Sequence, residues 1–335
     1  MTIKRVAAVL TVVAMLSAVA AWSAFSHWLT VPVHDNDSAL VFTVSQGATM
    51  QDVAADLSAR GYAYPRVLSL YARQQELAGQ LKVGEFEIPA GATPAEFLAV
   101  LVEGKTVSYP LTIIEGWTFE QMRDAVSSHP ALVQTVSTTA EIMAAIGQAE
   151  VHPEGRFYPD TYRVTRGQTD VAVYQQAFDA MSEQLASAWA QRQKGLPFMS
   201  AYEALIMASI IEKETGADEE REQISGVFAR RLHKGMRLQT DPTVIYGVGA
   251  AYRGDITRKH LTTDTPYNTY TRGGLPPTPI ALPGRASLNA AVTPDDGDTL
   301  YFVASGLGDG RHYFSKTLKE HNEAVQRYLA RTRGR

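Results

Sequence analysis

Hydrophobic residues follow two spacings along this chain. Short runs of alternating apolar and polar positions, bounded by turn residues, predict strands, and apolar positions three or four residues apart predict helices. The predicted strands are residues 40–44, 83–88, 107–114, 300–304 and 312–314. The predicted helices are residues 50–59, 65–77, 95–102, 119–127, 139–146, 169–191, 202–215, 219–234, 287–292 and 318–329. Together they predict an α+β fold.

The helix predicted over 202–215 differs from the others because it is apolar on almost every face. A helix of that kind is normally buried, yet its last turn carries Glu212 and Glu214 before Gly216. Two residues correspond to about 200° of helix rotation, so the two carboxylates cannot act side by side. A carboxyl on an apolar face is either a helix-end group that reaches water or a buried partner, or a general acid held protonated. The residues alone leave both interpretations open.

The N-terminus carries the longest apolar run. Lys4 and Arg5 precede an uncharged stretch from Val6 to Ser26, which is about 21 residues and therefore long enough to span a bilayer. Aromatic residues lie at its far end, as expected at a membrane interface: Trp22, Phe25 and Trp28.

A cleaved signal peptide usually has a shorter apolar core, roughly 7 to 15 residues. Small residues within 18–24 still leave cleavage open. We predict an uncleaved transmembrane anchor over residues 6–28, preceded by a cytoplasmic tail at 1–5. The two basic residues of that tail place everything after the anchor outside the cytoplasm.

Composition excludes several classes of function. The 335 residues are 45% hydrophobic and 20% charged, which suits a globular protein of two or more domains. The net charge of −4 argues against a nucleic-acid partner, and the absence of cysteine excludes zinc–cysteine, iron–sulfur and thiol chemistry. His260 with Asp264, and His312 with His321, lack a third ligand at a recognisable spacing. We therefore predict no metal and no cofactor.

Residues 38–114 form a first predicted α+β subdomain after the anchor. The segment from Val41 to Gly61 resembles the opening of a LysM module, in which a strand, a glycine-containing turn and a helix begin a glycan-binding fold. The subdomain could serve as a structural spacer, as a docking module or as a carbohydrate site.

Several loops of the remaining chain, residues 115–331, are polar without being strongly charged. The aromatic segment 154–162 is either ordinary packing or a platform on which sugar rings stack. Residues 238–243 and 267–270 carry hydroxyls and amides, and proline-rich segments stiffen 273–279 and 282–284. Stiff loops with such groups suit hydrogen bonding to a neutral glycan.

The run Ala208-Ser209-Ile210-Ile211-Glu212-Lys213-Glu214-Thr215 resembles the endolytic murein transglycosylase family, also called YceG-like. Further segments of that family's pattern follow in the same order: 154–162, 236–247, 267–270, 274–277, 300–303 and 321–322. Two positions depart from it. Thr278 stands where the family often has glycine, and Leu282 stands where a polar residue usually precedes Pro-Gly. Both affect the expected substrate contacts of one loop.

The resemblance implies a catalytic domain over 115–331 that cuts peptidoglycan strands internally as a lyase. Its catalytic glutamate falls on Glu212, with Glu214 as a possible supporting residue. Substrate contacts are expected at Gln239, Asp241, Tyr267 and Asn268.

In the implied reaction one carboxyl protonates the glycosidic oxygen between N-acetylmuramic acid and N-acetylglucosamine. It then accepts the proton of the muramic 6-hydroxyl, which attacks the anomeric carbon and leaves a 1,6-anhydro end. Ordinary glycosidases need two carboxyls. When the nucleophile is the substrate's own hydroxyl, one residue can serve as acid and then base. The apolar face under Glu212 is expected to favour its protonated form for the first step.

The resemblance further implies an inner-membrane protein whose catalytic domain lies in the periplasm. It would terminate nascent strands beside the peptidoglycan synthases. Two alternatives remain: a lysozyme-like hydrolase that yields reducing ends, and a membrane-tethered peptidoglycan-binding protein without catalysis.

Overall fold

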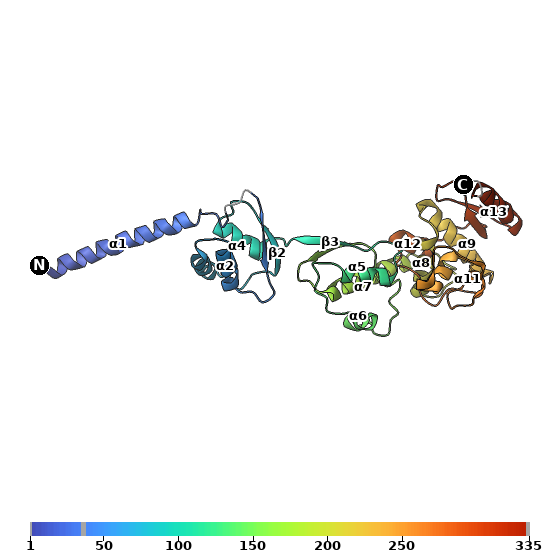
Figure 1. The fold of residues 1–335 in the computed structure, drawn as a ribbon, viewed down its shortest axis with the longest axis horizontal. Helices are drawn as coiled ribbons and strands as arrows, with labels where there is room; N and C mark the ends of the chain where they lie inside the picture. The colour runs from blue at the N-terminus through green and yellow to red at the C-terminus, as the bar shows by residue number, and fades with distance from the viewer. Residues whose placement is uncertain (1, 35–37, 333–335) are drawn as a thin grey trace. The chain divides into compact units, whose positions relative to one another are not determined.

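The computed structural model describes residues 2–34 and 38–332 of the chain (Figure 1). The first residue of the predicted cytoplasmic tail and residues 35–37 therefore lie outside the described part. The helices are α1 Thr2–Trp28, α2 Met50–Ala59, α3 Pro65–Gln74, α4 Pro94–Glu103, α5 Phe119–Ser127, α6 Thr139–Ala145, α7 Asp170–Ala190, α8 Ala201–Glu214, α9 Arg221–His233, α10 Asp241–Val248, α11 Arg258–Thr262, α12 Arg285–Val292 and α13 Leu318–Thr332. The strands are β1 Leu40–Val44, β2 Gly84–Ile88, β3 Ser108–Thr112, β4 Thr161–Thr165, β5 Tyr301–Ala304 and β6 His312–Ser315. The α+β class is confirmed.

The described chain divides into two compact units. Unit 1 comprises residues 1–109 with 131–133 and 163–168, and unit 2 comprises 110–130, 134–162 and 169–335. Each described strand has one partner: β1 pairs with β2, β3 with β4 and β5 with β6. With sheets this small, most of the apolar surface has to be buried by helices.

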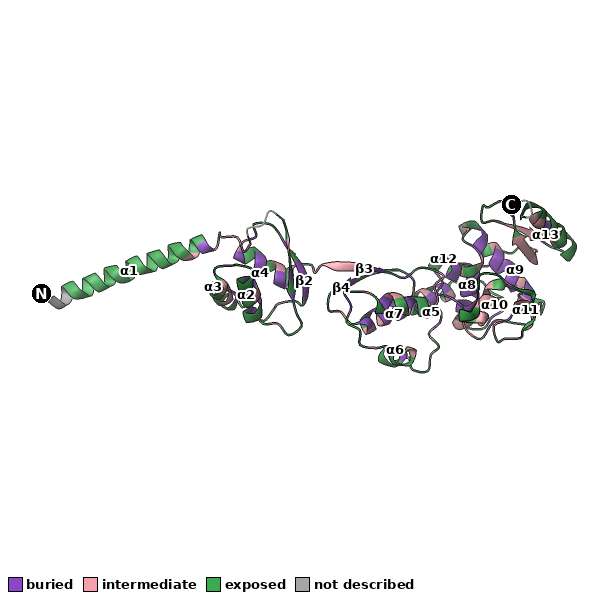
Figure 2. Ribbon diagram, viewed as in Figure 1, coloured by how far each residue is buried: buried purple, intermediate pink, exposed green. Residues whose placement is uncertain are grey.

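Helix α1 begins unit 1 and carries the predicted anchor. Its residues Arg5–Trp28 have a mean hydropathy of 2.1 and form the one helix of the described chain that is long and apolar enough to cross a membrane. Most of α1 is exposed (Figure 2). The interfacial role predicted for Trp28 is wrong, because this residue is buried and its indole N–H donates to the Tyr62 hydroxyl at 2.9 Å.

The core of unit 1 lies between the β1–β2 pair and helices α2 to α4. The strands run antiparallel, with Phe42 opposite Phe86. The Phe42 ring meets the edge of Phe97 of α4 at 5.2 Å between centroids. Helix α3 is shorter than predicted because Glu76, just beyond its end, has a left-handed backbone with φ of 60°.

Helix α8 is the centre of unit 2. It lies in one apolar core with parts of α7, α9 and α12, and eight consecutive residues from Ala204 to Ile211 are buried (Figure 2). A capping box fixes its start, because the Ser200 hydroxyl accepts from the Glu203 N–H and the Glu203 carboxylate accepts from the Ser200 N–H. The prediction of a buried helix is confirmed.

Candidate active site

The segment 280–284 lies between α8 and the residues that precede α5. The buried Ser209 hydroxyl of α8 accepts from the Ile280 N–H at 3.0 Å. Two backbone hydrogen bonds connect the segment to the residues before α5: the Gly116 N–H donates to the Leu282 carbonyl at 2.9 Å, and the Leu282 N–H donates to the Trp117 carbonyl at 2.7 Å. Leu282, one of the two departures from the family pattern, is therefore a core residue and not a polar contact.

Glu212 lies at the end of this segment. Its Oε2 accepts from the Gly284 N–H at 2.9 Å, and its side chain is partly exposed. The apolar neighbours predicted beneath it, Leu205 and Ala208, are buried, but they do not bury the Glu212 carboxyl itself. A Cβ on Gly284 would stand 1.8 Å from Glu115 Oε1, so a second carboxyl lies against the same glycine. The carboxyl of Glu212 is thus fixed by backbone and open on another side.

Glu214 points into a network of hydroxyl groups. The Thr240 hydroxyl donates to Glu214 Oε1, and the Thr240 N–H donates to Thr269 Oγ1 at 3.1 Å. Burial raises the pKa of Glu214 to about 7, with a further contribution from the nearby charge of Asp241, while the bond from Thr240 and the charge of Arg231 act in the opposite direction. As predicted from the helix rotation, Glu212 and Glu214 face different surroundings.

Two of the predicted substrate contacts are exposed around this network. Gln239 has a left-handed backbone with φ of 54°, a strained conformation for a residue that is not glycine. Its side chain is exposed. Asp241 opens α10, is also exposed and accepts from the Tyr270 hydroxyl at 2.6 Å. Both remain predicted substrate contacts.

Tyr267 and Asn268 are neighbours in sequence with different roles. The Tyr267 hydroxyl is 2.8 Å from Thr278 Oγ1, so the other departure from the family pattern contacts a predicted site residue. Asn268 is 1% exposed, and its amide donates to the backbone carbonyls of residues 260, 261 and 263. These bonds assign Asn268 to the shape of the loop, in place of the direct substrate contact predicted for it.

A cavity of about 980 Å³ opens beside the end of α8. Its walls come from unit 2 alone: Gly116, Thr118–Gln121 and Arg123, the segment His152–Glu154, Lys213 of α8, and residues of α10 and its surroundings, including Tyr246, Tyr252 and Tyr267. Glu212 does not line it, but its neighbour Lys213 does.

Glu154 is the buried carboxyl of this cavity, at 4% exposure, and no site role was predicted for it. Its Oε1 accepts from the Phe119 N–H at 2.9 Å and its Oε2 accepts from the Tyr246 hydroxyl at 3.0 Å. Burial raises the pKa of Glu154 to about 7 against the effect of those two bonds. The following Gly155 has φ of 78°, and a Cβ there would stand 2.4 Å from Pro279, so only glycine lets this segment pack against 279–281.

The aromatic segment after Glu154 is mainly packing. Phe157 is fully buried and stacks with Phe119 at 5.1 Å between ring centroids. Tyr162 is also buried, and its hydroxyl donates to the Tyr158 carbonyl at 2.6 Å. Of the two interpretations left open by the sequence, ordinary packing is the one the structure bears out for Phe157 and Tyr162.

The two residue pairs that were candidates for metal ligands, His260 with Asp264 and His312 with His321, contact other groups. His312 Nδ1 lies 2.7 Å from Glu220 Oε2, and the His321 ring stacks on Tyr301 at 5.3 Å. Asp264 forms an ion pair with Arg272 at 2.8 Å, while His260 belongs to the cap of α11.

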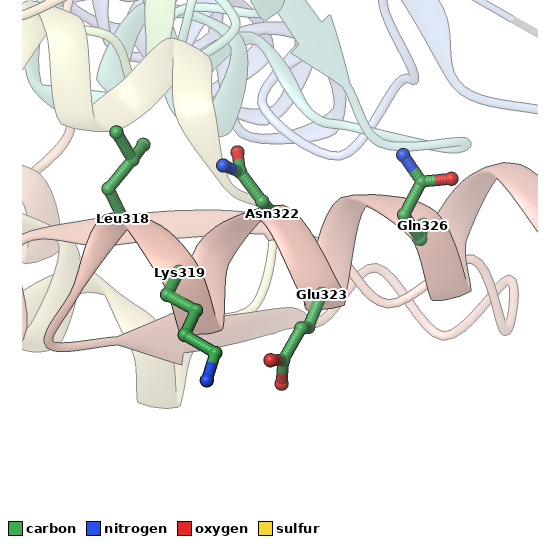
Figure 3. Close-up of a pocket in the computed structure, with 5 residues that line it drawn as sticks. All are labelled: Leu318, Lys319, Asn322, Glu323 and Gln326. Carbon is green, nitrogen blue, oxygen red and sulfur yellow. The ribbon is translucent and has the colours of Figure 1, made fainter.

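A second hollow, of about 460 Å³, follows the surface of α13 (Figure 3). Leu318, Asn322 and Gln326 project to one side of the helix, and Lys319 and Glu323 project to the other. These five residues come from a single helix, and the hollow lacks the convergence of elements seen around Glu212 and Glu154.

Comparison with known proteins identifies the family of this chain. A family model described as the YceG-like family matches residues 42–327, and the chain belongs to that family. It is similar to a crystal structure of a YceG-like protein from Listeria monocytogenes, with 32% identity and a TM-score of 0.53, covering 86% of this chain and 99% of that one. The predicted resemblance is confirmed.

Two curated relatives carry the name endolytic murein transglycosylase. The one from Bacillus subtilis is 39% identical over 180 residues, covering 53% of this chain and 49% of the relative. The one from Streptococcus pneumoniae strain D39 is 25% identical over 336 residues, covering 89% of this chain and 60% of the relative. The chain thus spans about half to three fifths of the length of these relatives.

Proposed function

We propose that this protein is an endolytic lytic transglycosylase of peptidoglycan. The observation that carries the proposal is Glu212, which is held by the Gly284 N–H at the end of a buried helix and remains open on another side. Two relatives named endolytic murein transglycosylase support the same activity.

In the proposed reaction the Glu212 carboxyl gives its proton to the glycosidic oxygen as the bond from muramic C1 to that oxygen breaks. The muramic 6-hydroxyl attacks C1 and returns its proton to Glu212, so the enzyme is regenerated. The products are a 1,6-anhydro muramic end and a new N-acetylglucosamine hydroxyl. The Gly284 N–H keeps the carboxyl oriented through both steps, and bound glycan would exclude water from it.

Gln239, Asp241 and Tyr267 are proposed to contact the sugar, while Glu214 is proposed to keep the end of α8 attached to Thr240 and thereby support Glu212. No cofactor is needed, because both proton transfers use the same carboxyl.

Residues 38–114 are proposed as a LysM-like docking unit and 115–331 as the catalytic domain. Helix α1 is proposed as the uncleaved anchor in the inner membrane, with its N-terminus in the cytoplasm and the catalytic domain in the periplasm. There it would cut strands near the peptidoglycan synthases and terminate their elongation. Protease treatment of intact spheroplasts checks the orientation, because only an outward domain is digested.

Product analysis tests the activity directly. Purified protein in detergent is incubated with uncrosslinked peptidoglycan strands, and the new ends are identified by mass spectrometry beside Glu212→Gln. Anhydro ends, lighter by one water than reducing ends, are expected from the wild type alone. Reducing ends would instead support the lysozyme-like alternative, and binding without new ends would support the non-catalytic one.

A further inference from the structure

The cavity beside α8 adjoins the candidate acid without containing it. Lys213 follows Glu212 directly and lines the cavity, as does Gly116. A Cβ on Gly116 would stand 3.9 Å from Glu212 Cγ and 3.7 Å from Lys213 Nζ. A bond that Glu212 protonates must lie within hydrogen-bond reach of its carboxyl. The cavity is therefore placed to hold a group attached to the reacting sugar, beside the scissile bond.

Lys213 gives this cavity an accessible positive charge. Its ammonium donates to the Gly116 carbonyl at 3.1 Å, which is a neutral acceptor, and its side chain is exposed. An ammonium has three donors, so an anion can bind there without displacing an acidic partner of Lys213 in the described chain.

Other lining residues add a second cation and apolar surface. Arg123 of α5 lines the cavity and has a guanidinium nitrogen 3.3 Å from the exposed carboxylate of Glu120, which lines the cavity as well. Phe119, Ile245 and Tyr246 line it as well. Glu154, whose pKa is raised to about 7, is partly neutral at physiological pH, which weakens its repulsion of an anion. A ligand with both methyl groups and carboxylates fits these walls.

We propose that this cavity binds the lactyl-peptide branch of the reacting muramic acid, with Lys213 and Arg123 contacting its carboxylates. The inference rests on the proposed function, in which muramic acid sits at Glu212 with its peptide attached at C3. The peptide stem combines alanine methyl groups with free carboxylates. A continued glycan would present neutral hydroxyl and acetamido groups, for which the charge of Lys213 has no use. Lys213 is thus a specificity residue for strands that still carry peptides.

The first experiment compares two substrates. Wild type, Lys213→Gln and Arg123→Gln are assayed on uncrosslinked strands and on the same strands stripped of peptides by an amidase. The lactyl carboxylate that the amidase frees is blocked as its methylamide, so that the stripped strand carries no carboxylate at this position. Lys213→Gln is expected to lower the ratio of kcat/KM on peptide-bearing to stripped strands about tenfold, the size of one charge-assisted hydrogen bond. Arg123→Gln is expected to lower it less, because Glu120 already shares its charge. Lys259→Gln, an exposed lysine of α11, is the matched control and leaves the ratio unchanged.

An equal loss on both substrates for Lys213→Gln would show that Lys213 serves the sugar or Glu212, and would overturn the inference. So would an unchanged ratio. If the wild type cleaves neither substrate, the proposed function fails instead.

A binding measurement keeps the two failures apart. Full-length Glu212→Gln protein in detergent is titrated with a reduced disaccharide tetrapeptide and with the same disaccharide carrying a lactyl methylamide in place of its peptide. The peptide form is expected to bind about tenfold more tightly at low salt, and this advantage should shrink at high salt and in the Glu212→Gln, Lys213→Gln double variant. Equal affinities for the two ligands would refute the peptide subsite whether or not the enzyme cleaves strands.

Discussion

The last turn of α8 presents two carboxyls to two different environments. On one side Glu212 accepts a single described hydrogen bond from backbone, at Gly284, and stays partly exposed. On the other side Glu214, whose residue is also partly exposed, accepts from Thr240, which is itself bonded to Thr269 in a buried cluster of hydroxyls. The two residues are of the same type and lie on the same helix. Their chemistry is decided by what the fold brings to them.

This contrast teaches which carboxyl can react. A group that must give and take a proton at a substrate needs a fixed position without a side-chain partner that competes for its oxygens, and the one printed bond of Glu212 comes from backbone. A group whose oxygen is held by a buried hydroxyl contributes to structure, and moving it would leave that hydroxyl without its partner. We therefore propose Glu212 as the reacting carboxyl and Glu214 as a residue that supports it.

The largest effect should come from replacing the two glutamates separately. Glu212→Gln keeps the shape and the acceptor for Gly284 but removes the proton, so strand cleavage should fall by about 10²–10⁴-fold or more with little change in melting temperature. Glu214→Gln keeps an acceptor for Thr240 and should retain activity within about tenfold. Rates are measured on purified strands and melting by circular dichroism. The assignment would be contradicted if Glu212→Gln cleaved strands at the normal rate, or if Glu214→Gln lost as much activity as Glu212→Gln is expected to lose.

A second prediction moves the segment that holds Glu212 and leaves the Glu214 cluster alone. Gly155→Ala places a methyl group 2.4 Å from Pro279 at a φ of 78°. It should lower the free energy of unfolding by about 3 kcal/mol, from clash and backbone strain together, and reduce cleavage as 279–284 shifts.

Gly147→Ala is the matched control, since Gly147 has a φ of 72° and nothing within 4 Å of an added Cβ. It should cost about 1 kcal/mol from the backbone alone. Urea unfolding of both variants measures the difference. If the two variants lose the same stability, the contact between Gly155 and Pro279 does not restrain the segment.

Much of the fold could be predicted from the sequence because many helix starts are encoded locally. Helices α2 and α5 have the predicted bounds, and Thr49 and Thr118 begin both with capping boxes. Helix α10, at 241–248, was not predicted. It follows a polar stretch, opens with Asp241 and Pro242, and is set by the burial of Thr243 and Val244. Strand β4 was missed as well, because its alternating pattern covers only five residues and begins inside the aromatic segment 154–162.

The residues of the candidate site also divide into those that could be predicted from the sequence and those that could not. Glu212 could be found from the family resemblance and from its position on an apolar helix. Glu154 could be read as part of a motif, but its partners, Phe119 and Tyr246, lie 35 and 92 residues away. Only the fold brings them together. The roles of Asn268 and Leu282 likewise depend on their burial, and the residue type at a loop position does not predict whether it is buried.

The smallest expected effect concerns pH and the two carboxyls with raised pKa. Glu214 and Glu154 titrate near 7 in the folded protein, against an ordinary value of 4.5. The folded state binds these protons more tightly than the unfolded state does. Stability is therefore greatest below about pH 4.5 with respect to these groups, and it is lost as pH rises through 7. Carboxyls with lowered pKa, such as Glu141 at about 2, lose their contribution only at more acidic pH.

The free energy of unfolding should accordingly fall between pH 5 and pH 8, by about 1–3 kcal/mol for each of the two groups. Glu214→Gln and Glu154→Gln should each flatten this slope, and the double variant should remove both contributions. Urea unfolding of full-length protein in detergent at several pH values measures it. If Glu214→Gln leaves the slope intact while Glu154→Gln flattens it, Glu214 is more accessible to water than its bond to Thr240 indicates. The two sides of the last turn of α8 would then differ less than their hydrogen bonds imply, and only the Glu212 and Glu214 activity assays would separate them.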